Sequence, residues 1–501
     1  MQSLPAIDPK LLELTAAQCT ALGPYFWVFG GCILAIIASV IKFMQPKWPV
    51  FLIALLTAIM GIVSSAGILH QETQTLFSGM MAADSFSSFF NIVFMASAAM
   101  TILASMRYLD RENLQHPEYY VLVLFSALGM MLMTAALDLI VIFISLEIMS
   151  LAVYILVGFR RADRKSNEAA IKYFVLGSAA SAVLLYGSAL IYGATGSLQI
   201  HAILAAIKAN PAAMSPMFTI GAWLVMIGFL FKVAAVPFQM WMPDVYEGAP
   251  TPVTGFMTTG LKAAAFATFV RVFIGLGYGQ GFSEVIQTHM HNILWVIAVL
   301  TMGVGNFVAL RQTNLKRMLA YSSIAHSGYL IVGMISGATS DQGYGPVVMY
   351  LVVYAIMNLG AFVILSIIGA RGDHGLDLQD MAGFASRRPW LAFALSLFLL
   401  SMAGIPPTAG FSAKYMIFNS AIQAGEIPLV IISVLCSVVS VFYYLRVLVN
   451  MYMREAEGSA PVARVSVWSA AVVIAMAVAT LQIGVMPTRL QAAAKRAVGS
   501  L

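Results

Sequence analysis

The sequence predicts an all-α, polytopic membrane protein, and two observations predict this fold class. Of its 501 residues, 60% are hydrophobic and only 10% are charged, which is too little charge for the surface of a soluble protein of this length. Apolar runs of about 20 residues, the length that crosses the hydrocarbon core of a bilayer, recur along the chain. We therefore expect residues 1–501 to form a single membrane domain of about fourteen transmembrane helices.

The apolar runs place the expected spans, two of which are irregular. The seventh runs into four prolines between Pro237 and Pro252, and the twelfth is interrupted by the sequence AGIPPTAGF at 403–411. Because proline removes a backbone donor and clashes with the preceding turn, we expect the seventh and twelfth helices to be discontinuous. The expected spans lie at about 22–42, 48–70, 84–106, 118–137, 139–159, 168–193, 215–236, 251–275, 290–310, 315–337, 343–370, 389–422, 427–452 and 463–486.

The order of the spans indicates an internal duplication. Spans four to eight (118–275) and nine to thirteen (289–452) each form a block of five, and the fourth member of each block is broken by proline. A lysine lies beside each break, Lys232 in the first block and Lys414 in the second. Since each block has an odd number of spans, the two repeats are expected to be inverted, as in many ion transporters. Residues 1–117 and 453–501 would supply flanking helices.

The distribution of Lys and Arg predicts the orientation. Even-numbered loops hold two, Lys208 and Arg271, whereas odd-numbered loops hold sixteen. The positive-inside rule therefore places the odd-numbered loops in the cytoplasm and both termini outside. The basic C-terminal residues Arg489, Lys495 and Arg496 disagree but are outnumbered. The sixteen are Lys42, Lys47, Arg107, Arg111, Arg160, Arg161, Arg164, Lys165, Arg311, Lys316, Arg317, Arg371, Arg387, Arg388, Arg454 and Arg464.

Glu147 and Lys232 are charged residues deep in apolar spans. A lysine at helix mid-depth costs about 2.5–3.5 kcal/mol on insertion scales, so its presence needs an explanation. Burial favours the neutral amine of a lysine, and a nearby carboxylate favours the ammonium form. We therefore expect Glu147 and Lys232 to form a switchable pair in which Lys232 takes up and releases a proton. The alternative for Glu147 is a protonated carboxyl that only joins helices.

Further protonatable groups lie in other spans. Lys262 and Lys414 are too deep to reach the interface, and we expect both to carry protons. His326 has serine and tyrosine neighbours, which favours a proton relay over a hydrogen-bonded core histidine. Lys172 lies near the end of its span, so an interfacial position and a functional one stay open. Arg446 is expected to be structural or to reach the interface.

The residue types present exclude several kinds of site. The cysteines Cys19, Cys32 and Cys436 are far apart in the sequence, which excludes a thiolate-ligated iron–sulfur centre. A row of lysines with one glutamate does not suit a divalent metal. The basic residues are dispersed over short loops, so no nucleic-acid partner is expected.

The segment FKVAAVPFQMWMPDVYEGAPTPVTGFMTTGLKAAAF (231–266) resembles the antiporter-like membrane subunits of respiratory complex I, NADH:quinone oxidoreductase. These are also similar to Mrp-type cation/proton antiporter subunits. Within the family the chain resembles the subunit N branch, which includes mitochondrial subunit 2. Two features distinguish this chain from the other branches of the family. The subunit M branch usually has glutamate where this chain has Lys414, and the subunit L branch has a long C-terminal lateral helix that is not expected in this sequence. The supporting motifs are GIPPTAGFSAKYMIF (404–418), LKRMLAYSSIAHSGY (315–329) and SLEIMSLAVYILVGF (145–159).

This resemblance implies a proton-translocating subunit that is driven by quinone reduction in other subunits. By analogy Glu147 and Lys232 would be the input pair, and Lys414 the outlet lysine. Lys262 and His326 would connect them. The match also covers a further family lysine, Lys172.

The same resemblance implies that this chain binds no cofactor. NADH, FMN, iron–sulfur clusters and quinone would be bound by other subunits of the complex. The implied partners are a sister antiporter-like subunit, small membrane subunits and membrane lipids. The loops MPDVYEG and RGDHGLDLQDMAGFASRR (371–388) are candidate contact points. The expected location is the bacterial plasma membrane, with the mitochondrial inner membrane as the alternative.

One residue departs from the family pattern. Many relatives have histidine in a PFHMW motif, whereas this chain has Gln239. Glutamine orients water but does not carry a proton at neutral pH, so water or another group would have to connect Lys232 to Lys262.

Three alternative functions of the chain remain: an Mrp-type sodium/proton antiporter subunit, a non-pumping scaffold and a solute permease. The presence of a single deep carboxylate disfavours the antiporter, and the excess of buried bases disfavours the scaffold. The lack of a substrate-sized polar cluster disfavours the permease.

Overall fold

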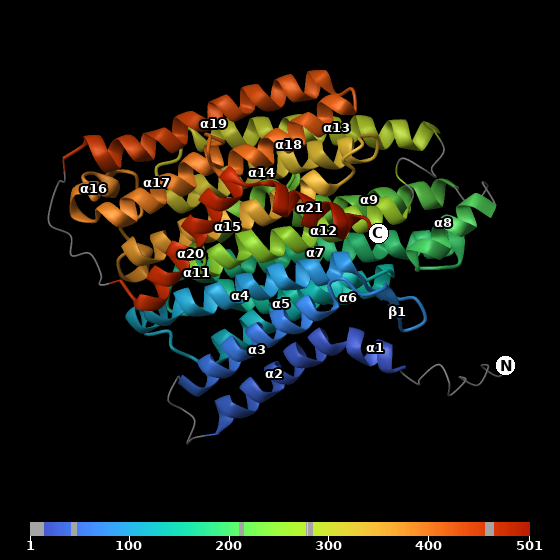
Figure 1. The fold of residues 1–501 in the computed structure, drawn as a ribbon, viewed down its shortest axis with the longest axis horizontal. Helices are drawn as coiled ribbons and strands as arrows, with labels where there is room; N and C mark the ends of the chain where they lie inside the picture. The colour runs from blue at the N-terminus through green and yellow to red at the C-terminus, as the bar shows by residue number, and fades with distance from the viewer. Residues whose placement is uncertain (1–14, 42–47, 210–214, 277, 279–283, 456–464) are drawn as a thin grey trace.

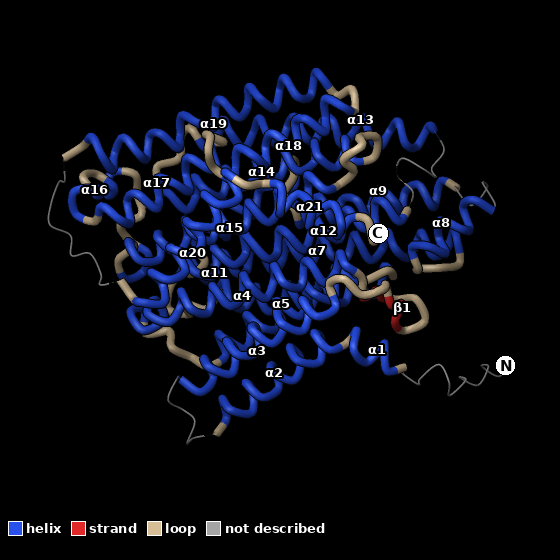
Figure 2. The backbone as a smooth tube through the Cα atoms, viewed as in Figure 1, coloured by secondary structure: helices blue, strands red, loops and turns tan. Residues whose placement is uncertain are grey.

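The computed structural model describes residues 15–41, 48–209, 215–276, 278, 284–455 and 465–501. Nearly all long segments are helices that run along the long axis of the molecule (Figure 1). Strands occur in this part of the chain as one antiparallel hairpin of β1 (Gln74–Leu76) and β2 (Met81–Ala83), at one end of the bundle (Figure 2). The predicted all-α fold of a multi-pass membrane protein is confirmed.

Twelve helices among the described residues are long and apolar enough to cross a membrane. Shorter elements lie between them and at the two ends of the chain. The twelve are α2 (Gly23–Val40), α3 (Trp48–Ile68), α4 (Ser85–Glu112), α5 (Glu118–Ala135), α6 (Leu139–Val157), α7 (Arg164–Thr195), the continuous run of α11 (Thr251–Phe256), η5 (Met257–Leu261) and α12 (Lys262–Gly275), α13 (Glu284–Ala309), α14 (Leu315–Gly337), α15 (Gly345–Ile368), α19 (Ile427–Met453) and α20 (Val467–Val485). The shorter elements are α1 (Ala16–Ala21), α8 (Ile200–Ala209), η6 (Arg371–Asp373), η7 (Gln379–Met381), α16 (Phe384–Arg387) and α21 (Thr488–Val498).

The two remaining expected spans are broken, as the prolines predict. The seventh consists of α9 (Pro216–Lys232), the turn η4 (Phe238–Met240) and α10 (Trp241–Gly248). The twelfth consists of α17 (Pro389–Ala403) and α18 (Ala409–Gln423). The number of fourteen spans and the two inverted five-helix repeats stay predictions, because these broken helices do not reach spanning length on their own.

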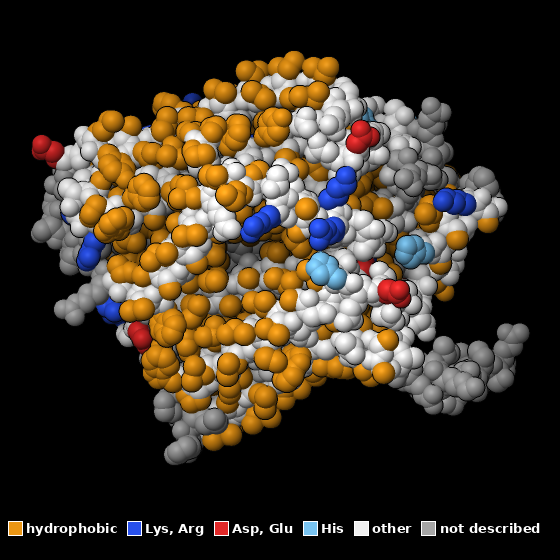
Figure 3. Space-filling view, in the orientation of Figure 1, with side chains coloured by type: hydrophobic (Ala, Val, Ile, Leu, Met, Phe, Trp, Pro, Cys, Tyr) orange, Lys and Arg blue, Asp and Glu red, His pale blue; other side chains and the backbone are white. Residues whose placement is uncertain are grey.

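The bundle has a buried centre and an apolar outer surface. In the most apolar stretch of α14, 94% of the residues are buried, against 22% in α20. On the face shown in Figure 3, apolar side chains cover most of the surface and the Asp and Glu side chains lie toward the two ends. An apolar belt of this kind matches a lipid or protein environment, so polar side chains that lie inside the bundle need protein partners.

Three basic residues that were assigned to loops are buried in the protein, namely Arg160, Arg271 and Lys316. Arg271 lies in α12 and forms an ion pair of 2.8 Å with Asp84, whose carboxylate also caps α4 by accepting from Ser87 N at 2.7 Å. Lys316 lies at the start of α14 and is 1% exposed. Arg271 lies four residues before the end of α12 and Lys316 is the second residue of α14, so both stay near the helix ends at which the sequence placed them. Lys42, Lys47 and Arg464 lie outside the described residues.

Candidate functional site

Lys232 is the last residue of α9 and points into the bundle where that helix ends. Its side chain is buried, and Nζ donates to Ser150 Oγ on α6 at 2.9 Å. Nζ also lies 5.8 Å from the centre of the Tyr154 ring, one turn further along α6. The break exposes backbone carbonyls, and Trp241 Nε1 satisfies one of them by donating to Phe231 O at 3.1 Å. The proline break thus leaves the lysine held by side chains from a neighbouring helix.

Glu147 does not contact Lys232 directly. It lies one turn before Ser150 on α6, is half-buried, and its Oε1 is a buried atom without a hydrogen-bond partner in the described structure. In this conformation Ser150 occupies the place next to the ammonium group, so the switchable pair of Glu147 and Lys232 stays a prediction. The charge of Glu147 acts on Lys232 at longer range. Sequence spacing shows which residues share a helix face but not which of them reaches the neighbouring helix.

Lys262 follows a π-helical turn, η5, in the middle of its span. Its side chain is 2% exposed, and Nζ donates to Ser323 O at 2.5 Å and to Ser323 Oγ at 2.6 Å. The Tyr354 ring centre lies 5.0 Å from the same nitrogen. A π turn inserts one extra residue into a helix and is frequent at functional sites. Here it directly precedes the lysine.

Lys414 lies in α18, beyond the second break. Its buried Nζ donates to Ala403 O, at the end of α17, at 3.1 Å and to Ser437 Oγ on α19 at 2.9 Å. The Tyr329 ring centre lies 5.1 Å from Nζ. The lysine thus satisfies a carbonyl that the break leaves free, and it is also held by a hydroxyl and an aromatic ring.

The three lysines therefore share one arrangement, in which each ammonium group meets a serine hydroxyl and a tyrosine ring. For Lys262 and Lys414 the serine and the tyrosine come from two different helices. Sequence reasoning found the lysines and missed these partners. Helical spacing was the signal that could have pointed to two of the serines. Ser150 lies three residues after Glu147, and Ser323 lies three residues before His326, so each serine shares a helix face with a residue that the sequence had singled out. The three sets are Lys232 with Ser150 and Tyr154, Lys262 with Ser323 and Tyr354, and Lys414 with Ser437 and Tyr329.

His326 lies between the sets of Lys262 and Lys414. Its Nδ1 is 2.6 Å from the Tyr350 hydroxyl, and its Nε2 is 3.4 Å from the Tyr444 hydroxyl. The ring centre lies 5.1 Å from that of Tyr354, the ring beneath Lys262, and 5.8 Å from that of Tyr329, the ring beneath Lys414. The histidine therefore has partners at both nitrogens and lies next to both lysine sets.

A small cavity connects Lys232 and Lys262. It has a volume of about 10 Å³, and its lining includes both lysines, Trp241 and Tyr246. This volume is about what one water molecule needs. Gln239, which stands where many relatives have histidine, lies in the η4 turn and has a buried Oε1 without a partner in the described structure. The cavity is thus at the lower limit of the volume that holds one water molecule between the two lysines.

Lys172 lies apart from this row, in an ionic cluster toward the N-terminal end of α7. Its side chain is 41% exposed, and Nζ lies 2.8 Å from both Asp244 and Glu168. Arg317 on α14 pairs with Asp244 at 2.7 Å and with Glu247 at 3.0 Å. This cluster ties α10 to α7 and α14, which agrees with the interfacial alternative for Lys172.

Arg446 has a structural role, as expected. Its guanidinium donates to Leu310 O at 2.8 Å and to Gln312 O, at the C-terminal end of α13.

Among the residues that the structure describes, no group of three or more His, Cys, Asp or Glu side chains is placed to hold a metal ion.

Comparison with known proteins identifies the family of this chain. The family model described as NADH:quinone oxidoreductase/Mrp antiporter, TM matches residues 136–440. The chain is 46% identical to NADH-quinone oxidoreductase subunit N of Trichlorobacter lovleyi, over 85% of this chain and 86% of the relative. It is 40% identical to NADH-quinone oxidoreductase subunit N 2 of Rhizobium meliloti, over 92% and 93% of the two chains.

A solved structure is similar over almost the whole fold. A chain of respiratory complex I from Thermus thermophilus, determined with bound aureothin, is 32% identical and superposes with a TM-score of 0.78. The similarity covers 93% of this chain and 98% of that one. The chain described here therefore belongs to the NADH:quinone oxidoreductase/Mrp antiporter family and, within it, to the subunit N group.

Proposed function

We propose that this chain translocates protons across the membrane as the subunit N of an NADH:quinone oxidoreductase, along the row Lys232, Lys262, His326 and Lys414. The observation that carries the proposal is the arrangement shared by the three lysines, each of which is buried next to a serine hydroxyl and a tyrosine ring. His326 lies between the second and third sets.

This arrangement suits a group that must gain and lose a proton. A serine hydroxyl accepts a hydrogen bond from an ammonium group and can rotate to donate one to a neutral amine. The face of a tyrosine ring stabilises a cation through its quadrupole. Both protonation states of each lysine therefore have a partner. A permanent ion pair would hold the ammonium form and stop the transfer.

The order of transfer follows from adjacency. A proton on Lys232 reaches Lys262 through the water position between them, and Ser323 lies next in line because it holds the Lys262 nitrogen. His326 is one turn beyond Ser323 on α14. It passes the proton toward Lys414 by way of the hydroxyl groups that contact its two nitrogens. Glu147 sets how strongly Lys232 holds its proton, through its charge rather than through direct contact.

The driving force comes from elsewhere in the complex. We infer that NADH, FMN, the iron–sulfur clusters and quinone are bound by other subunits, and that this chain carries no redox centre. Support comes from its three scattered cysteines, all of which are free in the structure. The partners are another antiporter-like subunit and small membrane subunits, and the exposed apolar side chains of the outer helices provide the contact surface.

Sodium transport of the Mrp type is less compatible with the site. A Na⁺ site needs several oxygen ligands, whereas the buried row consists of amines and an imidazole that repel a cation when they are protonated.

We further propose that the two five-helix blocks are inverted repeats, that the membrane is the bacterial plasma membrane, and that both termini lie outside. The excess of basic residues in the odd-numbered loops, sixteen against Lys208 and Arg271 in the even-numbered ones, supports this orientation.

The partners of Lys232 provide the test of this proposal. In the assembled complex, Glu147→Gln is expected to lower NADH:quinone turnover and proton uptake several-fold, because a charge beyond direct contact still contributes on the order of a kcal/mol at an effective dielectric constant of about 20. Ser150→Ala removes the hydroxyl that contacts Nζ, and it is expected to have an effect at least as large.

Both quantities would be measured in the same sealed vesicles, with Ser145→Ala on the same helix as the control. Ser145 Oγ donates to Val141 O within α6 at 2.7 Å, so its hydroxyl is held by its own helix. Wild-type rates for both Glu147→Gln and Ser150→Ala would contradict the proposed roles of these two residues.

A further inference from the structure

The loop between α15 and α16 directs one carboxylate into the protein. In the sequence RGDHG, Gly372 has φ +78° and Asp373 has φ +56°, left-handed values that a residue other than glycine adopts at a cost. Gly372 N donates to Glu112 Oε2 at 2.8 Å, which fixes this turn against the end of α4. As a result the Asp373 side chain is only 5% exposed, although the loop sequence looks like an ordinary polar connection.

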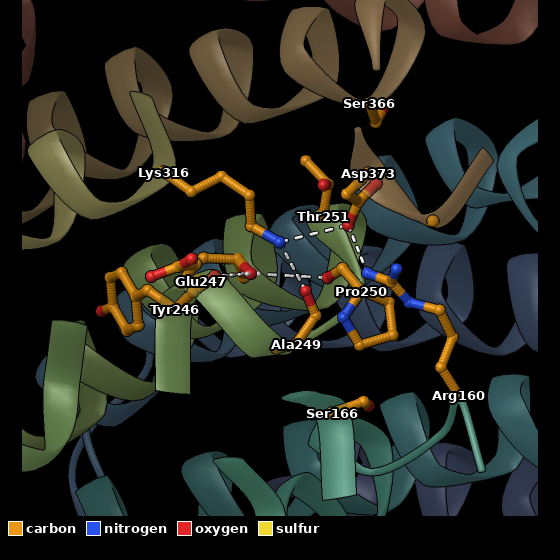
Figure 4. A network of polar contacts seen from close by, with 12 residues as sticks. Arg160, Ser166, Tyr246, Glu247, Ala249, Pro250, Thr251, Lys316, Ser366 and Asp373 are labelled. Carbon is orange, nitrogen blue, oxygen red and sulfur yellow. Dashed lines mark hydrogen bonds and ion pairs between the residues drawn. The ribbon is translucent and has the colours of Figure 1, made fainter. Parts of the chain in front are cut away.

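Asp373 is the centre of a buried polar network (Figure 4). Its carboxylate forms ion pairs with Arg160 and with Lys316, the latter at 3.1 Å. The Tyr108 hydroxyl contacts both carboxylate oxygens, at 3.0 and 3.1 Å. Burial alone would raise the pKa of Asp373, but Lys316 and Arg160 outweigh it and lower the pKa below its ordinary value. The carboxylate is therefore ionised at physiological pH.

The partners of Asp373 belong to the elements that carry the proton row. Arg160 lies three residues after the end of α6, the helix of Glu147 and Ser150. Lys316 begins α14, the helix of Ser323 and His326. Its Nζ also donates to Ala249 O at 2.6 Å, and Ala249 joins α10 to α11, the start of the span that carries Lys262.

Tyr108 connects the same network to the start of α11. Its hydroxyl accepts a hydrogen bond from Thr251 N at 3.3 Å while it contacts Asp373. Figure 4 shows the Lys316 ammonium group between Asp373 and Ala249, with Arg160 approaching the carboxylate from the other side. One carboxylate thus links α4, α6, α14 and the α10–α11 junction.

We propose that Asp373 is a positioning residue for proton transfer between Lys232 and Lys262, a role that rests on the function proposed above. Lys232 is held by α6, and Lys262 is held by α14. The cavity between them is lined from α10 by Trp241 and Tyr246. Asp373 fixes these three elements relative to one another, so it sets the separation that a proton must cross.

The expected effect is large because transfer rates depend steeply on geometry. A displacement of about 1 Å at a reacting centre can cost on the order of 100-fold in rate. Replacing Asp373 with asparagine leaves Lys316 without its ion-pair partner and Arg160 with Asp163 alone, at 3.4 Å, and it allows the elements to separate. We expect NADH:quinone turnover and proton uptake, each per assembled complex, to fall together by about tenfold. The KM for quinone should stay unchanged, because quinone is bound in other subunits.

The experiment compares Asp373→Asn with Asp341→Asn in the complete complex in sealed vesicles. Asp341 is an exposed carboxylate in the connection between α14 and α15, outside the loop 371–388 that is a candidate contact point. Wild-type turnover per assembled complex in Asp373→Asn, even with less complex present, would show a merely structural role and overturn the inference.

Two further variants keep the result decisive. If Asp373→Asn does not assemble, Tyr108→Phe removes the hydroxyl from the same carboxylate and retains all charges, and a several-fold loss of turnover per complex is expected. Wild-type turnover in Tyr108→Phe would then overturn the inference. Lys232→Met, measured in parallel, separates the two claims. If Lys232→Met stops proton pumping and the Asp373 variants pump as wild type does, the inference about Asp373 alone fails. Wild-type pumping in Lys232→Met would contradict the proposed function itself.

Discussion

Replacing Lys262 with methionine is expected to lower NADH:quinone turnover and coupled proton uptake to less than about a tenth of wild type, because a positioned proton-transfer group contributes on the order of 10²–10⁴-fold. Methionine fills a similar volume but does not carry a proton. It also leaves Ser323 O and Oγ without the donor that now lies 2.5 and 2.6 Å away. Turnover and the proton gradient would be recorded together on complexes of equal assembly.

Lys262→Arg makes this prediction more specific. Arginine keeps the positive charge but does not release its proton at physiological pH. If Lys262 acts as a carrier, arginine is therefore expected to fail as methionine does, whereas a purely electrostatic role predicts that arginine restores activity. Lys208→Met, an exposed lysine of α8, is the control and should behave as wild type. Restoration by arginine would contradict the carrier role.

Gly410→Ala is expected to prevent normal assembly of the subunit. A Cβ at this position would lie 1.8 Å from Ser401 O, a backbone atom that cannot move aside without displacing the end of α17. Gly410 N also donates to Ser401 Oγ at 3.0 Å, so the close approach is part of the break in the twelfth span. Overpacking usually costs about 1–3 kcal/mol, and a clash with backbone at a helix break lies at or above the upper end of that range.

The measurement for Gly410→Ala is the amount of intact complex in the membrane and its thermal stability. Gly303→Ala in α13 is the matched control, because a Cβ there meets no heavy atom within 4 Å. We expect Gly303→Ala to assemble as wild type does. Equal amounts of complex in both variants would contradict the close packing of α18 on α17.

The main features of the fold can be predicted from the sequence because the bilayer restricts the options. Apolar length specifies a spanning helix, and the prolines after Lys232 and before Lys414 specify where two spans break. The cost of burying a charge singles out Lys232, Lys262 and Lys414 as residues that need an explanation. These inferences depend on one residue and its sequence neighbours, so they do not require the tertiary structure.

The partners of these residues could not be predicted in the same way. Ser150, Ser323 and Ser437 are ordinary helix residues until helix rotation turns each toward a particular lysine. The burial of Arg271 could not be predicted because its partner, Asp84, is far away in the sequence. The burial of the Asp373 side chain could not be predicted because the left-handed turn directs it inward. In each case the missing information is the packing of distant segments.

The most direct test of proton transfer through this row is a simultaneous record of NADH:quinone turnover and the proton gradient in sealed vesicles that contain the intact complex with Lys232→Met. The present account predicts that both fall to a small fraction of wild type while the amount of assembled complex is unchanged, since the first carrier of the row is lost. Turnover and a gradient near wild type would show that Lys232 is structural, and would contradict the proton-carrier function proposed for this chain.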